Sequence, residues 1–337
     1  MHIRRRSITA RLRTLLQCTV LTVAAGFSAT LGAHPGRGIV VDAVGNVYVA
    51  DAVRSVVWRF APDGRIQAAA REVHAHWLAL DADGHVLADQ VRYDSDTRQF
   101  LRGLVRIDPT GSVTTIIAPR PDPDGLDAGA FAMRDGVLHV ARDSTPVIEG
   151  RRTGNVVRQV ALPAATATVN SLGFDAMGRV IVVRGREVLQ IAEDGTVSAT
   201  RIAPDGTGER VLGLRDLWGL AVGADGTRYT TDPGSRQVIA IAADGNSRVV
   251  HEVAAPWFPT GVATQGTQVL VLEHGLAGDT NLGPRVTRLR EGSAPDVLGT
   301  VEDAQPAAQW SRTATRPPGA RNGPGPDDSP ALRIGRC

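Results

Sequence analysis

The stretch that decides the fold is residues 38–66, GIVVDAVGNVYVADAVRSVVWRFAPDGRI. It contains three apolar runs, GIVVD, NVYVAD and SVVWRF, which are rich in the Val, Ile, Tyr and Trp residues that favour strands. A glycine turn at 43–45 follows the first run, and a second turn at 62–64 leads into a fourth run. The stretch therefore predicts four short antiparallel strands, which we name a, b, c and d in chain order.

The same unit recurs along the chain at intervals of roughly 40 to 50 residues. The glycine of the a–b turn recurs six times, at Gly45, Gly84, Gly136, Gly178, Gly226 and Gly266. A c–d turn glycine recurs at Gly64, Gly111, Gly195, Gly245 and Gly292, and the third unit is predicted to lack it. Six four-stranded units predict an all-β fold, a six-bladed β-propeller of four-stranded antiparallel blades, over residues 34–302.

Two units carry a family resemblance. GIVVDAVGNVYVADAVRSVVWRFAPDG and GLAVGADGTRYTTDPGSRQVIAIAADG closely resemble NHL-repeat propellers, and the chain is similar, more loosely, to the gluconolactonase and senescence-marker family. The resemblance covers about residues 38–302 and implies the propeller fold. It implies little about function, because one propeller framework carries many unrelated activities.

The two ends differ from the repeat in composition. Residues 1–33 hold five Arg and no acid, then an apolar run that ends in small residues, which predicts a signal peptide and an exported, periplasmic or extracellular protein. An uncut signal anchor is the alternative. Residues 303–337, rich in Pro, Gly and Arg, predict a disordered C-terminal tail.

The predicted propeller carries an excess of acidic residues, which argues against nucleic acid as a partner. Removal of the signal would leave Cys337 as the only cysteine, so no internal disulfide is expected. We expect a monomer without membrane attachment after cleavage. Because no strand precedes the first unit, we expect the ring to close by packing of blade six on blade one.

Loop lengths predict which face carries function. In a four-stranded meander the b–c loops and the d–a linkers lie on one face, here the top face, and the a–b and c–d turns lie on the bottom face. All a–b turns are short, whereas long excursions are predicted in the b–c loops of blades two, three and six. Functional loops are typically set on a rigid scaffold, so we expect the ligand on the top face. Neutral drift of loop length is the alternative.

The ends of the b strands carry polar residues: Asp51, Asp89, Asp143, Arg184, Asp232 and Glu273. An Asp at this position commonly holds the b–c turn through the backbone, and we favour that interpretation for Asp51 and Asp232. Asp89, Asp143 and Glu273 border longer loops and are predicted to be freer to face a ligand. Candidate ligand-binding residues at these strand ends are Asp89, Asp143, Asp232 and Glu273.

The entrances of the a strands lie closest to the central channel, and they hold Arg37, Trp77, Ala130, Asn170, Trp218 and Thr260. The gluconolactonase resemblance implies a divalent metal held here by one Glu and two or three Asn or Asp. Only Asn170 matches that pattern, since Arg37 and Trp218 occupy positions where acids would be expected. One neutral ligand does not hold a hard cation, so we predict no metal and leave calcium or zinc as the less favoured alternative.

Aromatic residues replace the missing ligands. Trp77 and Trp218, with His74, His76 and residues 257–258 on the adjacent linkers, predict a pocket for a small molecule or glycan. Its candidate ligand-binding residues are Trp77, Trp218, Asn170 and His76. The alternative is that the Trp side chains are wedges between blades.

Two functions remain open. One is a binding propeller for a small molecule, glycan or peptide; the other is a gluconolactonase-like hydrolase with an altered or lost metal site. No nucleophile elbow, phosphate loop or spaced His cluster occurs in the sequence, so no catalytic residue is assigned. We favour binding.

The mature protein should begin between residues 30 and 35, because the apolar run ends there in small residues just before the first strand. N-terminal sequencing of exported protein checks this. Intact Met1 on that material would mean an anchor.

Overall fold

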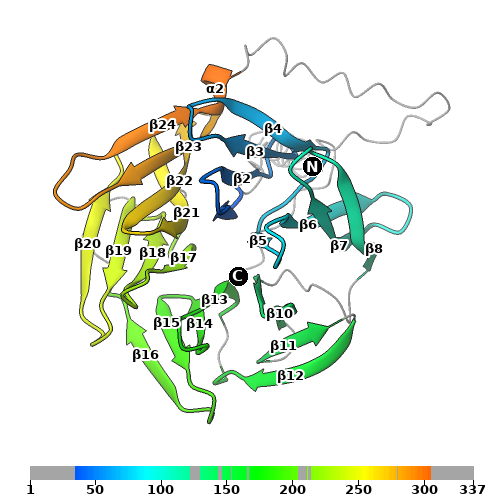
Figure 1. The fold of residues 1–337 in the computed structure, drawn as a ribbon, viewed down its shortest axis with the longest axis vertical. Coiled ribbons are helices and arrows are strands. Elements are labelled where there is room, and N and C mark those ends of the chain that lie inside the picture. Colours follow the sequence, from blue (N-terminus) through cyan, green and yellow to red (C-terminus); the bar gives the residue numbers. More distant parts are fainter. Residues whose placement is uncertain are drawn as a thin grey trace, which may run out of the picture.

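The computed structural model describes residues 35–121, 130–142, 146–152, 154–164, 167–203, 211, 214–278 and 280–304. Six four-stranded antiparallel sheets surround a central axis, and the strands of each sheet follow one another in chain order (Figure 1). The predicted six-bladed propeller is therefore confirmed. The proposed signal peptide and nearly all of the proposed tail lie outside the described residues and stay predictions.

The blades have these strands. Blades 1 to 3 contain β1 (Ile39–Val41), β2 (Val47–Asp51), β3 (Val56–Phe60), β4 (Ile66–Arg71); β5 (Leu78–Leu80), β6 (Val86–Asp94), β7 (Gln99–Ile107), β8 (Val113–Pro121); and β9 (Phe131–Arg134), β10 (Val137–Arg142), β11 (Val147–Arg152), β12 (Asn155–Ala161). Blades 4 to 6 contain β13 (Val169–Phe174), β14 (Val180–Arg184), β15 (Glu187–Ile191), β16 (Val197–Arg201); β17 (Leu220–Val222), β18 (Arg228–Asp232), β19 (Gln237–Ile241), β20 (Ser247–Glu252); and β21 (Trp257–Gln265), β22 (Gln268–Ala277), β23 (Thr280–Leu289), β24 (Asp296–Thr300).

The turn glycines adopt the backbone conformation that made them recognisable. Gly45 and Gly226, for example, have φ of 91° and 82°, a region in which a side chain is strained. One prediction was wrong here. The third unit does have a c–d turn glycine, Gly154 with φ of 86°, between β11 and β12.

The excursions also differ from the prediction. In blade 3, residues 147–152 form strand β11 itself, so the b–c connection is only residues 143–146 and not a long loop. The sequence misled because the short β11 carries Glu149, Arg151 and Arg152 where apolar alternation was expected. In blades 2 and 6 the excursions are paired extensions of the β6–β7 and β22–β23 hairpins.

The core lies between the blades. Buried side chains of the described residues form six clusters, one at each junction of neighbouring blades. Between blades 4 and 5, for instance, Ile181 and Val183 pack against Ile239 and Ile241. Each blade therefore buries both faces only when both neighbours are present, as in other repeat architectures.

Blade 6 packs on blade 1 as predicted, and residues after the last strand add further contacts between the two blades. Val301, in the short helix α2 (Val301–Ala304), is fully buried in the cluster that joins these two blades. The next residue, Glu302, accepts hydrogen bonds at Oε1 from the Arg54 guanidinium of blade 1 (3.0 Å) and from the Gly283 amide of blade 6 (2.6 Å). No described helix is long and apolar enough to cross a membrane.

A buried histidine sits in the same junction. His274 on β22 donates a hydrogen bond to the Gly36 carbonyl of the incoming chain. Burial lowers the pKa of His274 to about 3, with a further lowering by the charge of Arg54. The imidazole is therefore neutral at neutral pH in the folded protein.

Deleting residues 305–337 should leave stability nearly unchanged, whereas Val301→Ala should cost about 2–3 kcal/mol because it empties a fully buried position. Urea unfolding of both forms checks this. A large loss on deletion of 305–337, with Val301→Ala silent, would show that the ring closure depends on residues after α2.

The contribution of His274 to the free energy of unfolding should be fully present above about pH 6.5, the ordinary histidine pKa, and should be lost as the pH falls towards 3. The unfolded chain binds a proton at His274 that the folded protein excludes, so acid favours unfolding. The free energy of unfolding measured at pH 8, 6 and 5 should fall less steeply for His274→Gln than for the parent. Parallel pH curves would contradict the assignment.

Candidate ligand-binding site at the mouth of the channel

Four of the six strand-a entrance residues meet at the top of the channel. Nη1 of Arg37 donates a hydrogen bond to Oδ1 of Asn170 at 2.9 Å, across 133 residues of chain. The Arg37 guanidinium lies over the ring of Trp218, 4.2 Å from its centroid, and 5.6 Å from the centroid of the Trp77 ring. Blades 1 and 4 are opposite in a ring of six, so the Arg37–Asn170 bond spans the channel.

A β-bulge aims Asn170 at the channel. The β13–β14 register shifts between Val169 and Ser171, which leaves Asn170 without a partner on the neighbouring strand. Nδ2 of Asn170 donates a hydrogen bond to the Leu217 carbonyl at 2.9 Å. The backbone carbonyl of Asn170 accepts one from Nε1 of Trp77 at 3.2 Å. Asn170 thus links blades 1, 2 and 4 to the linker that enters blade 5.

The small side chain of Ala130 explains how Trp77 reaches so far. Trp77 enters from blade 2, and Ala130 occupies the equivalent entrance of blade 3. Both belong to the cluster between blades 3 and 4. Trp77 therefore passes over blade 3 to hydrogen-bond with blade 4.

The two tryptophans differ in solvent exposure. Trp218 is only 4% exposed and lies beneath Arg37, as the wedge alternative requires. Trp77 and Arg37 are partly exposed, so they form the surface of the mouth. Nearby, burial raises the pKa of the Asp216 carboxyl, while the charges of Arg37 and Arg186 act in the opposite direction.

The acids at the ends of β2 and β18 hold their loops. Asp51 is fully buried and accepts hydrogen bonds from Nε1 of Trp58 (3.1 Å) and the Arg54 amide (3.1 Å). Asp232 is also fully buried, accepts from the Ser235 amide at 3.1 Å, and pairs with Arg186 at 2.8 Å. Both residues have the turn-stabilising contacts that we favoured.

Asp89 and Glu273 were expected to be freer to face a ligand, and that expectation was wrong. Asp89 is 5% exposed, and its Oδ1 accepts from the backbone amides of His76 (2.7 Å) and Trp77 (2.8 Å). Glu273 is fully buried and its Oε2 accepts from Nε of Arg285 at 2.6 Å. Burying a carboxylate requires such partners, so these acids fix the loops instead of lining the surface. Asp143 lies outside the described residues.

The histidines of the linker into blade 2 lie beside the mouth. The backbone carbonyl of His76 accepts from the amides of Arg37 and Gly38, and Nδ1 of His76 is 3.5 Å from Oδ2 of Asp89. The ring of His74 is 4.9 Å from that of His76. Burial foremost, then the His76 ring, lowers the pKa of His74 to about 4, so this imidazole is neutral at neutral pH.

Sequence reasoning missed Arg37 as a site residue and treated it only as an obstacle to metal. A usable signal was present, because Arg37-Gly38 occupies the same repeat position as Trp218-Gly219 and Thr260-Gly261. A Cβ on Gly38 would lie 2.5 Å from the Leu78 nitrogen, and one on Gly261 would lie 2.2 Å from the Arg37 oxygen. These glycines let the inner strands approach closely, which places the preceding side chains at the mouth.

The mouth does not fit a divalent cation of the gluconolactonase type. Asn170 is the one entrance residue that matches the metal pattern, and its Oδ1 accepts from the cationic Arg37. A guanidinium on the single suitable oxygen opposes a second cation there. We derive no metal chemistry at this position.

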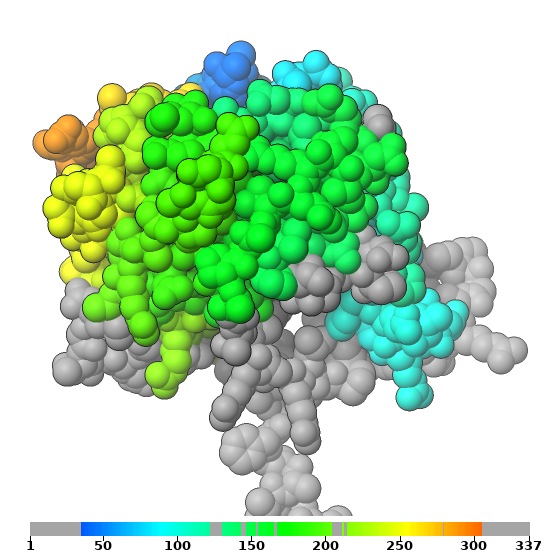
Figure 2. Space-filling view, turned by 90° about the horizontal axis from the view of Figure 1, so that it is seen from below, coloured from blue at the N-terminus to red at the C-terminus, as the bar shows by residue number. Residues whose placement is uncertain are grey.

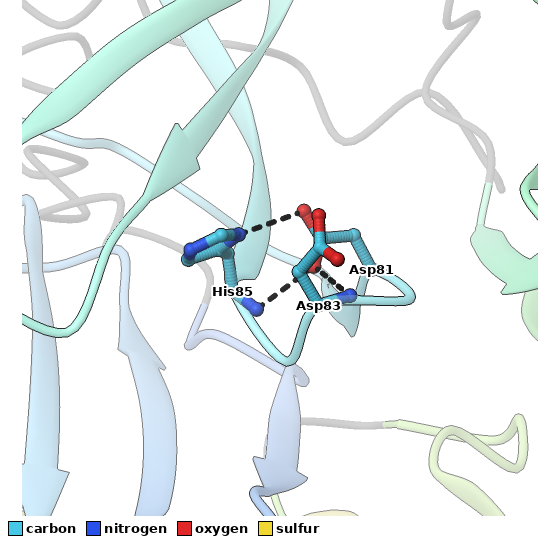
Figure 3. A group of neighbouring side chains, drawn as sticks. All are labelled: Asp81, Asp83 and His85. Atoms are coloured by element: carbon cyan, nitrogen blue, oxygen red, sulfur yellow. Dashed lines mark hydrogen bonds and ion pairs between the residues drawn. The ribbon is translucent and has the colours of Figure 1, made fainter.

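A second group could hold a metal, on the bottom face of blade 2 (Figure 3). Asp81, Asp83 and His85 each offer a ligand atom within 4.8 Å of the others. Asp81 Oδ1 accepts from the amides of Asp83 and His85, and Oδ2 is 3.2 Å from Nδ1 of His85. The equivalent turn at Asp42 uses the same contacts, with Asn46 in place of His85, so the turn itself accounts for the arrangement.

Comparison with known proteins places the fold. No family model and no curated protein matches the chain. Among solved structures it is similar to a streptogramin B lyase (TM-score 0.54, 11% identity, covering 80% of this chain and 85% of that one). It is also similar to virginiamycin B lyase from Staphylococcus aureus (0.52, 15%, 78% and 83%) and to a putative gluconolactonase (0.51, 16%, 70% and 84%). At these identities the likeness shows the fold alone, so the chain is a six-bladed β-propeller with the architecture of the lyases and of gluconolactonase-like proteins.

Proposed function

We propose that this protein is an exported binding propeller whose channel mouth takes a small, oxygen-rich ligand with a carboxylate or a similar anionic group. The proposal rests on the position and contacts of the Arg37 side chain. Its guanidinium is partly exposed at the top of the channel, stacked on Trp218 and hydrogen-bonded to Asn170.

Preorganisation makes this arginine suited to binding. The stacking contact and the hydrogen bond fix the plane of the guanidinium in the free protein. Ligand binding therefore loses less conformational entropy of the Arg37 side chain. A guanidinium recognises carboxylates in its own plane and strengthens each hydrogen bond by its charge. The partly exposed indole of Trp77 adds a flat apolar wall beside this charge, which suits a sugar ring or another small ring.

The described contacts favour binding over hydrolysis. A hydrolase would need a cation or a general base at the mouth. Asp89 holds backbone amides there, and the oxygen of Asn170 that could bind metal holds Arg37. The gluconolactonase-like alternative therefore lacks a set of metal ligands at this position among the described residues. Export is supported by the composition of residues 1–33.

Arg37→Gln should weaken binding of a small anionic ligand roughly 10- to 100-fold, because it removes a charge-assisted hydrogen bond. Ligand-induced thermal shifts would be measured against sugar acids, their lactones, neutral sugars and short peptides. Trp257→Ala is the control, because it disrupts an equivalent arginine–tryptophan stack in blade 6. There the Arg285 guanidinium lies over the Trp257 ring, 4.2 Å from its centroid. Equal binding by parent and Arg37→Gln would refute the site.

Trp218→Ala should destabilise the fold by about 3–5 kcal/mol, because the side chain is almost fully buried. Asn170→Ala should cost less, about 1–3 kcal/mol, by leaving the Leu217 carbonyl without its donor. Urea unfolding measures both. A mild effect of Trp218→Ala would mean that Trp218 lines an open pocket and is not a wedge.

A further inference from the structure

The β6–β7 hairpin of blade 2, like the β22–β23 hairpin of blade 6, is longer than the corresponding hairpins of the other four blades. Its strands have nine residues each, whereas β2 and β3 of blade 1 have five. Figure 2 shows this hairpin, in cyan, projecting from the top face, which points down in that view. The strands stay paired up to Asp94 and Gln99, so the projection is a rigid ribbon.

The register puts five side chains on one face of the ribbon: Val91, Tyr93, Phe100, Arg102 and Arg120. Tyr93 is opposite Phe100, and Val91, two residues away on the same face, is opposite Arg102. Arg102 is in turn opposite Arg120 of β8. We name Tyr93, Phe100, Arg102 and Arg120 the hairpin face.

The aromatic half of the hairpin face is exposed to solvent. Tyr93 and Phe100 are each 39% exposed, although they are the largest apolar side chains of the ribbon. Their ring centroids are 5.2 Å apart with the planes inclined by 60°. The pair makes a fixed aromatic platform, since cross-strand aromatic pairs stabilise each other in the sheet.

The basic half of the hairpin face places two arginines, Arg102 and Arg120, directly opposite each other on neighbouring strands. Arginines directly opposite each other across two strands repel, which costs the sheet stability. Neither Arg102 nor Arg120 has an ion pair or hydrogen bond with any residue that the structure describes. Asp94, an acid at the tip, accepts instead from Thr97 (2.7 Å) and the Asp96 amide (3.0 Å), and it is opposite Gln99 on the other face.

We propose that the hairpin face binds an acidic polysaccharide, a chain of sugars that carry carboxylates. Two guanidinium groups side by side match carboxylates spaced along a polymer, and the repulsion between them is relieved when the anion is bound. The aromatic platform packs against the apolar faces of the sugar rings. This surface is separate from the channel mouth and does not require a ligand there.

An acidic peptide is the less suitable occupant. Extended peptides commonly bind by adding a strand to a sheet edge through backbone hydrogen bonds. The outer edge of the projection is β8, which carries Pro119 and Pro121 at this height, and proline has no amide hydrogen to donate. Recognition here must therefore rest on side chains, as the two arginines and the aromatic pair allow.

The test measures binding of the full-length protein to immobilised polygalacturonate, with dextran as the neutral polymer and poly-glutamate as the acidic peptide. The parent should bind polygalacturonate and not dextran. Arg102→Gln/Arg120→Gln should weaken binding at least tenfold, and Tyr93→Ser/Phe100→Ser three- to tenfold.

The matched control is Arg201→Gln/Arg248→Gln, which removes the same charge from exposed positions on β16 and β20. It should bind polygalacturonate like the parent. An equal loss in this control would show a general charge effect and overturn the proposal. Equal affinity for poly-glutamate and polygalacturonate, or no binding by the parent, would overturn it as well.

Discussion

The structure depends on burial between blades, because no blade can cover its own two faces. The six apolar clusters sit at the six junctions, so removing one blade would expose two of them. The junction of blades 6 and 1 differs from the others, since no short linker joins its two sides. There the chain adds the buried Val301 and the Arg54–Glu302 contact, which hold the last blade to the first.

The same closure forms the mouth of the channel. The inner strands approach so closely that a Cβ on Gly219 would lie 2.9 Å from the Gly261 Cα. This close approach brings side chains from opposite blades within reach of one another. The Arg37–Asn170 bond and the contact of Arg37 with Trp218 follow from it. A site at this mouth is therefore coupled to the integrity of the whole ring.

Most acids near the top face act within the structure. Asp51, Asp89, Asp232 and Glu273 are buried, and each carboxylate contacts amides, an indole or arginines, because a buried carboxylate without any partner would be costly. The surface of the mouth holds Arg37 and Trp77, with the partly exposed Asp216 nearby, and the hairpin face lies on blade 2. Both surfaces suit anions with a ring-shaped body.

The sequence by itself determined the repeat. Turn glycines such as Gly45 and Gly226 act locally, through φ values that other residues avoid, so they reveal the blade number and most strands before any packing is known. It failed at blade 3, where charged residues hide the periodicity of β11. Only the tertiary structure decided the site. The bulge at Asn170, the path of Trp77 past Ala130 and the burial of Asp89 and Glu273 depend on blades that meet when the ring closes. Residues 133 apart in the chain become neighbours then, and no local pattern encodes that contact.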